Sequence, residues 1–337
     1  MSSKLINILA IESSCDETSA AVVQNSKVLS NTIATQKVHE RYGGVVPELA
    51  SRAHMQHIVP VVDTALKDAG VNKNAIMAVA FTQSPGLIGS LLVGACFAKG
   101  YAQALNIPLI AVHHMQAHVL AHFIEAQPPF PFLCLTVSGG HTQIVLCRDF
   151  LDMEVLGETI DDAAGEAFDK VAKMLGLPYP GGPLVDKYAT DGDPMRFKFP
   201  ISEMKDYEFS FSGIKTSVLY FLQAQKKIDP DFVEKNIRDI CASVQHTIIN
   251  MLMAKLKKAA KALDIKHIGI AGGVSANSGL RKAIKEAGEK YGWTVYIPRF
   301  EYCTDNAAMI GIAGYYKYLR GAFTDLTASP TARATWQ

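Results

Sequence analysis

Two histidines one helical turn apart are the first residues in this sequence whose spacing indicates chemistry. His114 and His118 are four positions apart in the run VHHMQAHV. On a helix this spacing places both imidazoles on one face, where they can chelate one metal ion. The alternative is a pair of polar helix histidines in a His-rich stretch. Met115 stands where a zinc peptidase has its catalytic glutamate, so a peptidase of that type would lack its general base.

Asp305 is the candidate for a third metal ligand. It precedes an apolar run that predicts a helix over 305–320. Its alternative role is an ordinary N-cap, because aspartate is favoured at helix starts. Two histidines and one carboxylate would leave coordination positions open for a substrate, as a catalytic metal site requires.

Two glycine pairs form a second kind of candidate site. The run VSGGH, from Val137 to His141, is a tight turn between two expected strands, and the run GGVSAN, ending at Asn277, opens a helix after a buried strand. Adjacent glycines let backbone N–H groups approach a phosphate, and a helix N-terminus favours an anion. The ordinary alternatives are a hairpin turn and a strand-to-helix loop. Asn277 would bind a ligand or cap the helix.

Acidic side chains make up the third group of candidates. Asp162, Glu166 and Asp169 fall on one face of an expected helix, an arrangement that is also typical of a solvated acidic stripe. Asp16 and Glu17 lie in a polar turn after the first expected strand, where turn chemistry alone favours aspartate. No residue stands out as a general base, and Asp16 and Glu17 are candidates by position only.

A duplicated hairpin would position these residues. Runs rich in strand-forming residues at 8–12 and 18–23 flank one polar turn, and runs at 132–137 and 142–147 flank the VSGGH turn. The two hairpins lie far apart, and each opens one half of the chain. This repeat predicts two related lobes.

The rest of the chain alternates helical and strand-like patterns, as in an α/β protein. Apolar spacing predicts a long helix over 49–69, and a Gly/Pro turn at 84–89 opens a helix through Ala102. The Pro-rich stretch at 127–131 is the expected lobe boundary. Further strands are expected at 76–82, 107–112, 267–271 and 293–297, and further helices at 161–175, at 231–263, from Ser278 and at 305–320.

Composition indicates a globular protein in a reducing compartment. The 337 residues exceed the usual size of one domain, which favours two lobes. Six scattered cysteines, none in a Cys-x-x-Cys pair, are typical of buried thiols. The N-terminus lacks a signal-peptide pattern and no apolar run approaches the ~20 residues of a membrane span, so we expect a soluble, cytoplasmic protein. The net charge of +1 does not indicate a basic face for nucleic acid.

Several of these runs together resemble one family. In chain order the sequence carries IESSCDET, VPELASRAH, SPGL, a run from Lys99 to Pro108, HMQAH, VSGGHT, FSFSG, GGVSAN and CTDN. These motifs are jointly specific, and the chain resembles the TsaD family, formerly called glycoprotease or Gcp, in its bacterial form without a fused kinase domain. One departure is Gln116-Ala117, where members often have Glu-Gly; both positions lie off the expected chelating face.

The resemblance implies an actin-like, Hsp70-like (ASKHA) α/β fold of two duplicated RNase-H-like lobes. We expect an N-terminal actin-like lobe at 1–127 with the histidine ligands, a C-terminal actin-like lobe at 128–325 with the nucleotide and substrate pocket, and a mobile tail at 326–337. The implied enzyme is a tRNA N6-adenosine threonylcarbamoyltransferase. It transfers the threonylcarbamoyl group from threonylcarbamoyl-AMP to N6 of adenosine 37 in tRNAs that read codons starting with A, and releases AMP.

The same resemblance implies site residues and partners. His114, His118 and Asp305 are the implied ligands of one iron(II) ion per subunit, with zinc(II) as an expected substitute in vitro. The implied partners are tRNA, threonylcarbamoyl-AMP, the related protein TsaB and the ATPase TsaE, with no membrane. The residues implied in the threonylcarbamoyl-AMP pocket are Val137, Ser138, Gly139, Gly140, His141, Asp169, Gly182, Asp186 and Asn277.

Three other functions stay open on the residues alone. A metallopeptidase would need the glutamate that Met115 replaces, and a sugar kinase or ATPase of the same fold would need a sugar pocket. A non-catalytic scaffold would have no need of an open metal site.

The helix expected at 49–69 and the charge of the chain bear on partners. Its apolar face is either part of the lobe's own core or a docking surface for TsaB, and it consists of Leu49, Ala53, Ile58, Val61 and Val62. A net charge of +1 predicts weak tRNA binding by the isolated chain, because affinity for a nucleic-acid backbone scales with the phosphates neutralised by Lys and Arg. We therefore expect full activity only in a complex.

Overall fold

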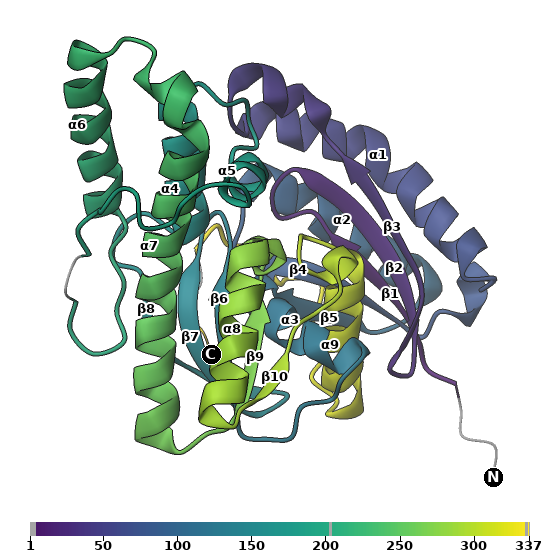
Figure 1. Ribbon diagram of the computed structural model, residues 1–337. Helices are drawn as coiled ribbons and strands as arrows, with labels where there is room; N and C mark the ends of the chain where they lie inside the picture. The colour runs from purple at the N-terminus through teal and green to yellow at the C-terminus, as the bar shows by residue number, and fades with distance from the viewer. Residues whose placement is uncertain (1–4, 202–203, 334–335, 337) are drawn as a thin grey trace. The chain divides into compact units, whose positions relative to one another are not determined.

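The computed structural model describes residues 5–201, 204–333 and 336 (Figure 1). Its contacts divide the chain into two units, and each unit is built on one five-stranded sheet. The first unit consists of Met1–Pro128, Arg148–Met153 and Pro298–Gln337, and the second of Pro129–Cys147 and Glu154–Ile297.

The first sheet is a three-stranded meander extended by two parallel strands. β1 (Asn7–Glu12) pairs antiparallel with β2 (Glu17–Gln24), which pairs antiparallel with β3 (Lys27–Thr35). On its other side β1 pairs parallel with β4 (Ala78–Ser84), and β4 with β5 (Leu109–His113). The central strand β1 is buried along its whole length, and the first expected hairpin is confirmed.

The second sheet repeats this order of strands. β6 (Phe132–Val137) and β7 (Thr142–Asp149) form the second expected hairpin, and β8 (Asp152–Glu158) continues the meander. β9 (His267–Ala271) pairs parallel with β6, and β10 (Thr294–Tyr296) pairs parallel with β9. The orders β3-β2-β1-β4-β5 and β8-β7-β6-β9-β10 are equivalent, so the repeat predicted from the hairpins is confirmed.

Helices of the first unit pack around its sheet. Ile58, Val61 and Val62 of α1 lie in the core with strand residues such as Leu9, so the core alternative is correct for these three. Leu49 is only half-buried. The helices of this unit are η1 (Lys37–Tyr42), α1 (Pro47–Asp68), η2 (Lys73–Ala75), α2 (Ile88–Leu105), α3 (His114–Leu120), η3 (Ala121–Ile124), η5 (Phe300–Tyr302) and α9 (Ala307–Leu319).

Helices of the second unit enclose a separate core. The longest, α7, contributes a buried row that includes Ile240, Val244 and Leu252 to a cluster with strand residues such as Leu135. The helices of this unit are α4 (Ala164–Met174), α5 (Gly182–Ala189), α6 (Ser212–Ile228), α7 (Phe232–Leu263), η4 (Gly273–Ala276) and α8 (Ser278–Tyr291).

The last part of the chain belongs to the first unit, which differs from the expected lobe at 128–325. Helix α9 packs closely on the first sheet. A methyl group added at Gly311 would lie 2.5 Å from Val23, and one at Gly314 would lie 2.6 Å from Ala80. These glycines let the apolar helix cover the sheet, which explains why a distant segment returns to it.

The tail at 326–337 was expected to be mobile. Its described part is instead hydrogen-bonded within the first unit: Thr331 N–H donates to the carbonyl of Gln83 at 3.1 Å, and Gly86 N–H donates to the carbonyl of Ala332 at 3.2 Å. Residues 334, 335 and 337 lie outside the described residues.

Helix α2 bears on the expected absence of membrane spans. It is 18 residues long and apolar enough, by length and composition, to cross a membrane. The prediction that no apolar run approaches the length of a membrane span is therefore wrong for this segment. In the structure α2 packs against α1 and β4, with Leu91, Ala95 and Ala98 buried, and a core helix passes the same test of length and composition.

Candidate metal centre and substrate pocket

The two histidines of the expected metal site lie on one face of a short buried helix. β5 runs directly into α3, so that His114 is the first residue of the helix and His118 follows one turn later. Their ring centroids are 4.7 Å apart, with the rings perpendicular. Met115, at the position of a zinc peptidase's glutamate, is buried in the core. The helical spacing is confirmed, and Met115 offers no carboxylate to activate water.

Asp305 brings a carboxylate to the same two rings. Its Oδ1 lies 3.3 Å from Nε2 of His114 and 3.2 Å from Nε2 of His118. Helix α9 is capped by Asn306 instead, whose side-chain oxygen accepts the N–H of Met309. The N-cap alternative for Asp305 is therefore wrong, and its carboxylate faces the histidines.

The start of α9 is anchored to the first sheet, which fixes the loop that carries Asp305. The N–H of Ala307 donates to Oγ of Ser19 on β2 at 2.9 Å, and the N–H of Ala308 donates to Oδ1 of Asn31 on β3 at 3.2 Å. The meander thereby positions a carboxylate that is 187 residues from His118 in the sequence.

The donor atoms of this cluster fit a single divalent cation. One ligand atom from each of His114, His118 and Asp305 lies within 4.8 Å of the other two. Ligand atoms around a tetrahedral ion with bonds of about 2.1 Å are roughly 3.4 Å apart, and the distances of 3.3 and 3.2 Å from the two histidines to Asp305 are close to this value. Two imidazoles and one carboxylate suit iron(II) or zinc(II) and leave coordination positions open.

Burial and mutual charge set the protonation of the cluster. Burial opposes ionisation of Asp305, but the neighbouring His114 and His118 lower its pKa well below the usual value. Burial also opposes a charge on His114, yet Asp305 and Glu12 raise its pKa. Burial lowers the pKa of His118. The carboxylate is therefore ionised, as a metal ligand must be.

Glu12, the last residue of β1, belongs to this cluster and was missed in the sequence. It is fully buried, and its Oε2 lies 3.0 Å from Nδ1 of His114. The same oxygen accepts a hydrogen bond from Thr82 at 2.5 Å, and Oε1 accepts the N–H of Ser14 at 2.5 Å. No spacing pattern links Glu12 to a histidine 102 residues away, so only the fold reveals the pair.

The two candidates for a general base lie at the turn between β1 and β2. Burial raises the pKa of Glu17 to about 9, and the negative charges of Asp305 and Asp16 add to this effect. A carboxyl group with that pKa is protonated at neutral pH and donates a proton rather than accepting one. Glu17 therefore does not have the protonation state of a general base at neutral pH. Asp16 stays a candidate by position only.

In the second unit the VSGGH run forms the expected tight turn between β6 and β7. The N–H of Ser138 donates to the carbonyl of His141, and the N–H of His141 donates to Oγ of Ser138. Gly139 and Gly140 are exposed, and a methyl group at either would meet no atom within 4 Å. The protein's own packing does not require these glycines, so their small size leaves the turn's backbone open to a ligand.

Helices α4 and α5 extend from this turn. The N–H of Gly165, in the first turn of α4, donates to the carbonyl of Ser138 at 3.2 Å. Further along α4, Oδ1 of Asp169 accepts the N–H groups of Gly181 and Gly182 at 2.8 and 2.9 Å, where α5 begins. The N-terminus of α4 therefore lies against the turn, and Asp169 fixes the start of the next helix.

Contacts at α8 and η4 connect α5 back to the end of β6. Asp186 of α5 accepts hydrogen bonds from the N–H and Oγ of Ser278, the first residue of α8. Gly272, which precedes η4, has φ of 83°, and a methyl group there would lie 2.5 Å from the carbonyl oxygen of Val137. These contacts link the segments that the sequence analysis expected around a threonylcarbamoyl-AMP pocket, and the binding of that donor stays a prediction.

Asn277 connects the start of α8 to α7. Its Oδ1 accepts the N–H of Leu280 at 2.9 Å, which caps α8, and its Nδ2 donates to Oε1 of Gln245 at 2.7 Å. Of the two roles that the sequence left open for Asn277, capping is confirmed. A ligand role stays a prediction.

The helix expected at 161–175 begins only at Ala164, so the expected acidic face of Asp162, Glu166 and Asp169 is only partly helical. Asp162 precedes α4, so it does not share a helical face with Asp169. Asp162 pairs with Lys170 and Lys215, and Glu166 also pairs with Lys170. These two carboxylates therefore form a surface charge network, whereas Asp169 accepts the backbone N–H groups at the start of α5.

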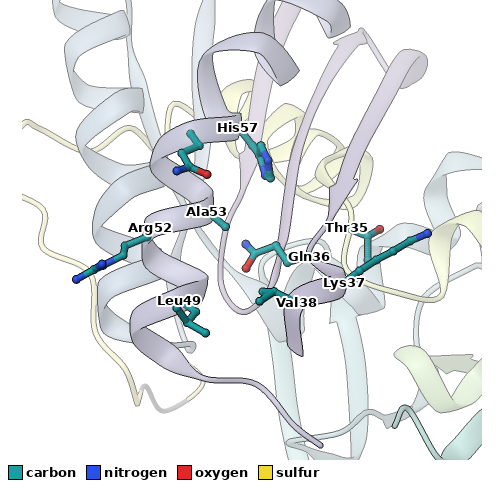
Figure 2. Close-up of a pocket in the computed structure, with 9 residues that line it drawn as sticks. Thr35, Gln36, Lys37, Val38, Leu49, Arg52, Ala53 and His57 are labelled. Atoms are coloured by element: carbon teal, nitrogen blue, oxygen red, sulfur yellow. The ribbon is translucent and has the colours of Figure 1, made fainter. Parts of the chain in front are cut away.

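A surface pocket of about 410 Å³ lies elsewhere in the first unit, between α1 and the end of β3 (Figure 2). Figure 2 shows the Arg52 side chain directed away from the other labelled residues. The expected site residues do not line this pocket. Its lining consists of Thr35, Gln36, Lys37, Val38, Leu49, Arg52, Ala53, Gln56 and His57.

The two equivalent sheets define a protein of the actin-like, ASKHA class. The chain is similar to full-length HypF in its phosphate- and nucleotide-bound form, at 14% identity and a TM-score of 0.61, over 93% of this chain and 46% of HypF. It is also similar to the activator of 2-hydroxyisocaproyl-CoA dehydratase from Clostridium difficile, at 13% identity and a TM-score of 0.51, over 94% and 97% of the two chains. These likenesses concern the fold alone.

Sequence relatives identify the family. The family model for TsaD, tRNA N6-adenosine threonylcarbamoyltransferase, matches residues 27–312. Proteins described by that enzyme name are 64% identical in Christiangramia forsetii, over 99% of both chains, and 60% identical in Cytophaga hutchinsonii, over 97% of this chain and 96% of the relative. The chain belongs to the TsaD family: it transfers a threonylcarbamoyl group to N6 of adenosine in tRNA and forms t6A. The peptidase and kinase interpretations are not favoured.

Proposed function

We propose that this transferase works with one divalent metal ion held by His114, His118 and Asp305. The resemblance to the family favours iron(II), with zinc(II) as a substitute in vitro. The observation that carries the proposal is that one ligand atom from each of the three residues lies within 4.8 Å of the others. Asp305 is available for this role because Asn306, not Asp305, caps α9. A bound ion would polarise and orient the carbonyl group that is transferred.

The donor in this proposal is threonylcarbamoyl-AMP, bound in the second unit. The open backbone at Gly139 and Gly140 supplies N–H groups for its phosphate, and the positive end of the α4 helix dipole lies against this turn. The proposed pocket residues are Val137, Ser138, Gly139, Gly140, His141, Asp169, Gly182, Asp186 and Asn277.

The chemistry explains why such a donor is needed. The exocyclic amine of adenine is a poor nucleophile, because its lone pair is delocalised into the ring. In the mixed anhydride the bond between the carbamoyl carbon and a phosphate oxygen breaks as the bond to N6 forms, and the amine loses a proton. Backbone N–H groups at the glycine turn and the positive end of the α4 helix dipole stabilise the negative charge that develops on the departing AMP.

We further propose that the protein acts in the cytoplasm with TsaB and TsaE. Apolar side chains that the first unit leaves exposed support a docking surface: Met55 and Val59 on α1, and Ile88 and Leu92 on α2, are between 45% and 68% exposed. The two helices pack against each other in the structure. The proposed docking surface therefore consists of these exposed side chains of α1 and α2, in place of the Ile58, Val61 and Val62 face that the core buries.

Metal analysis tests the central part of the proposal. Full-length wild-type protein, loaded with iron(II) under nitrogen and desalted, should retain one ion per chain, and Asp305→Asn should retain almost none. His246→Ala, which removes a histidine of the second unit, is the matched control and should bind like wild type. Equal metal content in wild type and Asp305→Asn would show that the ion, if any, binds elsewhere.

A further inference from the structure

The two ring nitrogens of His114 face two different carboxylates. Nε2 lies 3.3 Å from Oδ1 of Asp305, on the side of the proposed ion, and Nδ1 lies 3.0 Å from Oε2 of Glu12. The Glu12 side chain is 0% exposed. A fully buried carboxylate is costly unless its oxygens are hydrogen-bonded, so its partners indicate what it does.

The partners of Glu12 hold its carboxylate in one orientation. Oε1 accepts the N–H of Ser14, and Oε2 accepts the hydroxyl of Thr82. Glu12 ends β1 and Thr82 lies on β4, and these strands pair in parallel up to Ile11 and Phe81. The hydrogen bonds thus come from the sheet itself, and the remaining acceptor capacity of Oε2 is directed at His114.

The second histidine lacks such a partner. Nδ1 of His118 is buried and has no hydrogen-bond partner among the residues that the structure describes. Oγ of Ser14 also approaches Nδ1 of His114, at 3.3 Å, but a hydroxyl at that distance is a weaker acceptor than a carboxylate at 3.0 Å. Of the two imidazoles, only that of His114 therefore has a buried carboxylate, Glu12, as the hydrogen-bond partner of its Nδ1 among the described residues.

We propose that Glu12 is a positioning residue of the metal centre. It accepts the Nδ1–H of His114, which fixes the tautomer whose unprotonated Nε2 points toward Asp305 and the ion. A neutral imidazole has one N–H, so an acceptor at Nδ1 decides which nitrogen can bind metal. The inference rests on the proposed metal site and states what orients its first ligand.

The test compares metal affinity in Glu12→Gln and Glu12→Ala with wild type. Losing such a partner lowers metal affinity on the order of 10- to 100-fold. Competitive zinc(II) titration of the full chain should therefore show about tenfold weaker binding for Glu12→Gln, because the glutamine carbonyl still accepts Nδ1–H. Glu12→Ala should show a larger loss of zinc affinity. In the zinc-loaded wild type, ¹⁵N NMR of the His114 ring should show a protonated Nδ1 with Nε2 bound to the metal, and in Glu12→Ala this signal should shift.

Controls separate this role from a purely structural one. Glu158→Gln makes the same substitution at the last residue of a strand, β8 of the second unit, and should leave the zinc affinity unchanged. If Glu12→Ala fails to fold, Thr82→Val keeps the acid but removes one bond that orients it, and should weaken zinc binding several-fold.

Three results are decisive. Wild-type affinity in the folded Glu12 or Thr82 variants, with metal loss in Asp305→Asn, would overturn the role of Glu12 and leave the metal site standing. Lower thermal stability of the metal-free variants with unchanged affinity would also overturn it. If wild type binds no ion, the metal site fails and the role of Glu12 fails with it.

Discussion

At the scale of single residues, the structure separates side chains that the fold itself uses from those that it does not use. Asn306 caps α9, and the adjacent Asp305 is left to face two histidines. Gly272 is required by its positive φ and by its contact with Val137, whereas Gly139 has open space around it. Adjacent or similar residues in the sequence therefore have different roles, and only their contacts reveal which is which.

His122, four residues after His118, should give the protein an acid-sensitive stability. Burial lowers its pKa to about 4, below the usual 6.5, so the folded state resists taking up the proton that the unfolded chain binds. The stabilising contribution is fully present above pH 6.5 and is lost progressively as the pH falls from 6.5 to 4, at a cost of about 3 kcal/mol.

Urea unfolding of the chelated protein at pH 7 and pH 4.5 measures this contribution. His122→Gln, which cannot take up a proton, should lose about 2–3 kcal/mol less stability between the two pH values than wild type. An identical pH dependence in both proteins would show that His122 does not control acid stability.

At the scale of elements, the sequence predicts best the segments with strong periodicity. The two hairpins and the boundaries of β9 and α7 agree with the expectation to within a residue or two. Strand β3 was missed because its pattern, KVLSNTIAT, is mixed and half-exposed, as at a sheet edge. The metal triad could be named from the family pattern, but Glu12 could not, because a strand's last residue carries no periodic signal.

Two glycine substitutions in the second unit should have opposite effects. Gly272→Ala places a methyl group 2.5 Å from the carbonyl oxygen of Val137 at a φ of 83°, so we expect a loss of about 2–4 kcal/mol of stability. Gly139→Ala meets no atom within 4 Å and should keep wild-type stability. Because its methyl group would obstruct the exposed backbone, it should instead weaken AMP binding.

Thermal unfolding and calorimetry with AMP measure the two effects separately. An unchanged AMP affinity in stable Gly139→Ala would show that the glycine turn does not bind the nucleotide. Wild-type stability of Gly272→Ala would show that the strand and η4 can separate without cost.

At the scale of the whole molecule, the repeat of one sheet order was predictable, but the division of the chain was not. The Pro-rich boundary near 128 agrees with the structural division, while Pro298–Gln337 joins the first unit. Such a return depends on which sheet α9 covers, and composition does not contain that information. The net charge of +1 likewise conceals an uneven distribution: residues 254–293 contain nine Lys and Arg but three Asp and Glu.

This basic segment predicts where the chain contributes to tRNA binding. Lys282 and Lys285 are exposed on α8, so the double charge reversal Lys282→Glu, Lys285→Glu should weaken tRNA binding and reduce its salt dependence. Filter binding at several salt concentrations measures both. The matched reversal of Lys226 and Lys227, at the end of α6, should have less effect, and a larger effect there would place the contact on α6 instead.

Isolated chain should bind tRNA weakly and turn over poorly with donor and tRNA, because its overall charge is close to neutral. Addition of TsaB and TsaE should restore turnover, measured as t6A formed per chain over time. Efficient multiple turnover by the isolated chain would show that its own surface is sufficient for tRNA.

The most direct test of metal-dependent transfer is mass spectrometry of tRNA nucleosides after reaction with threonylcarbamoyl-AMP, with TsaB and TsaE present, for wild type and for His118→Ala. We expect t6A with iron-loaded wild type, its loss on chelation, its return when iron(II) is added back, and its absence with folded His118→Ala under every condition. Undiminished t6A formation by His118→Ala, in protein shown to contain no metal, would contradict the claim that His114, His118 and Asp305 hold the ion on which threonylcarbamoyl transfer depends.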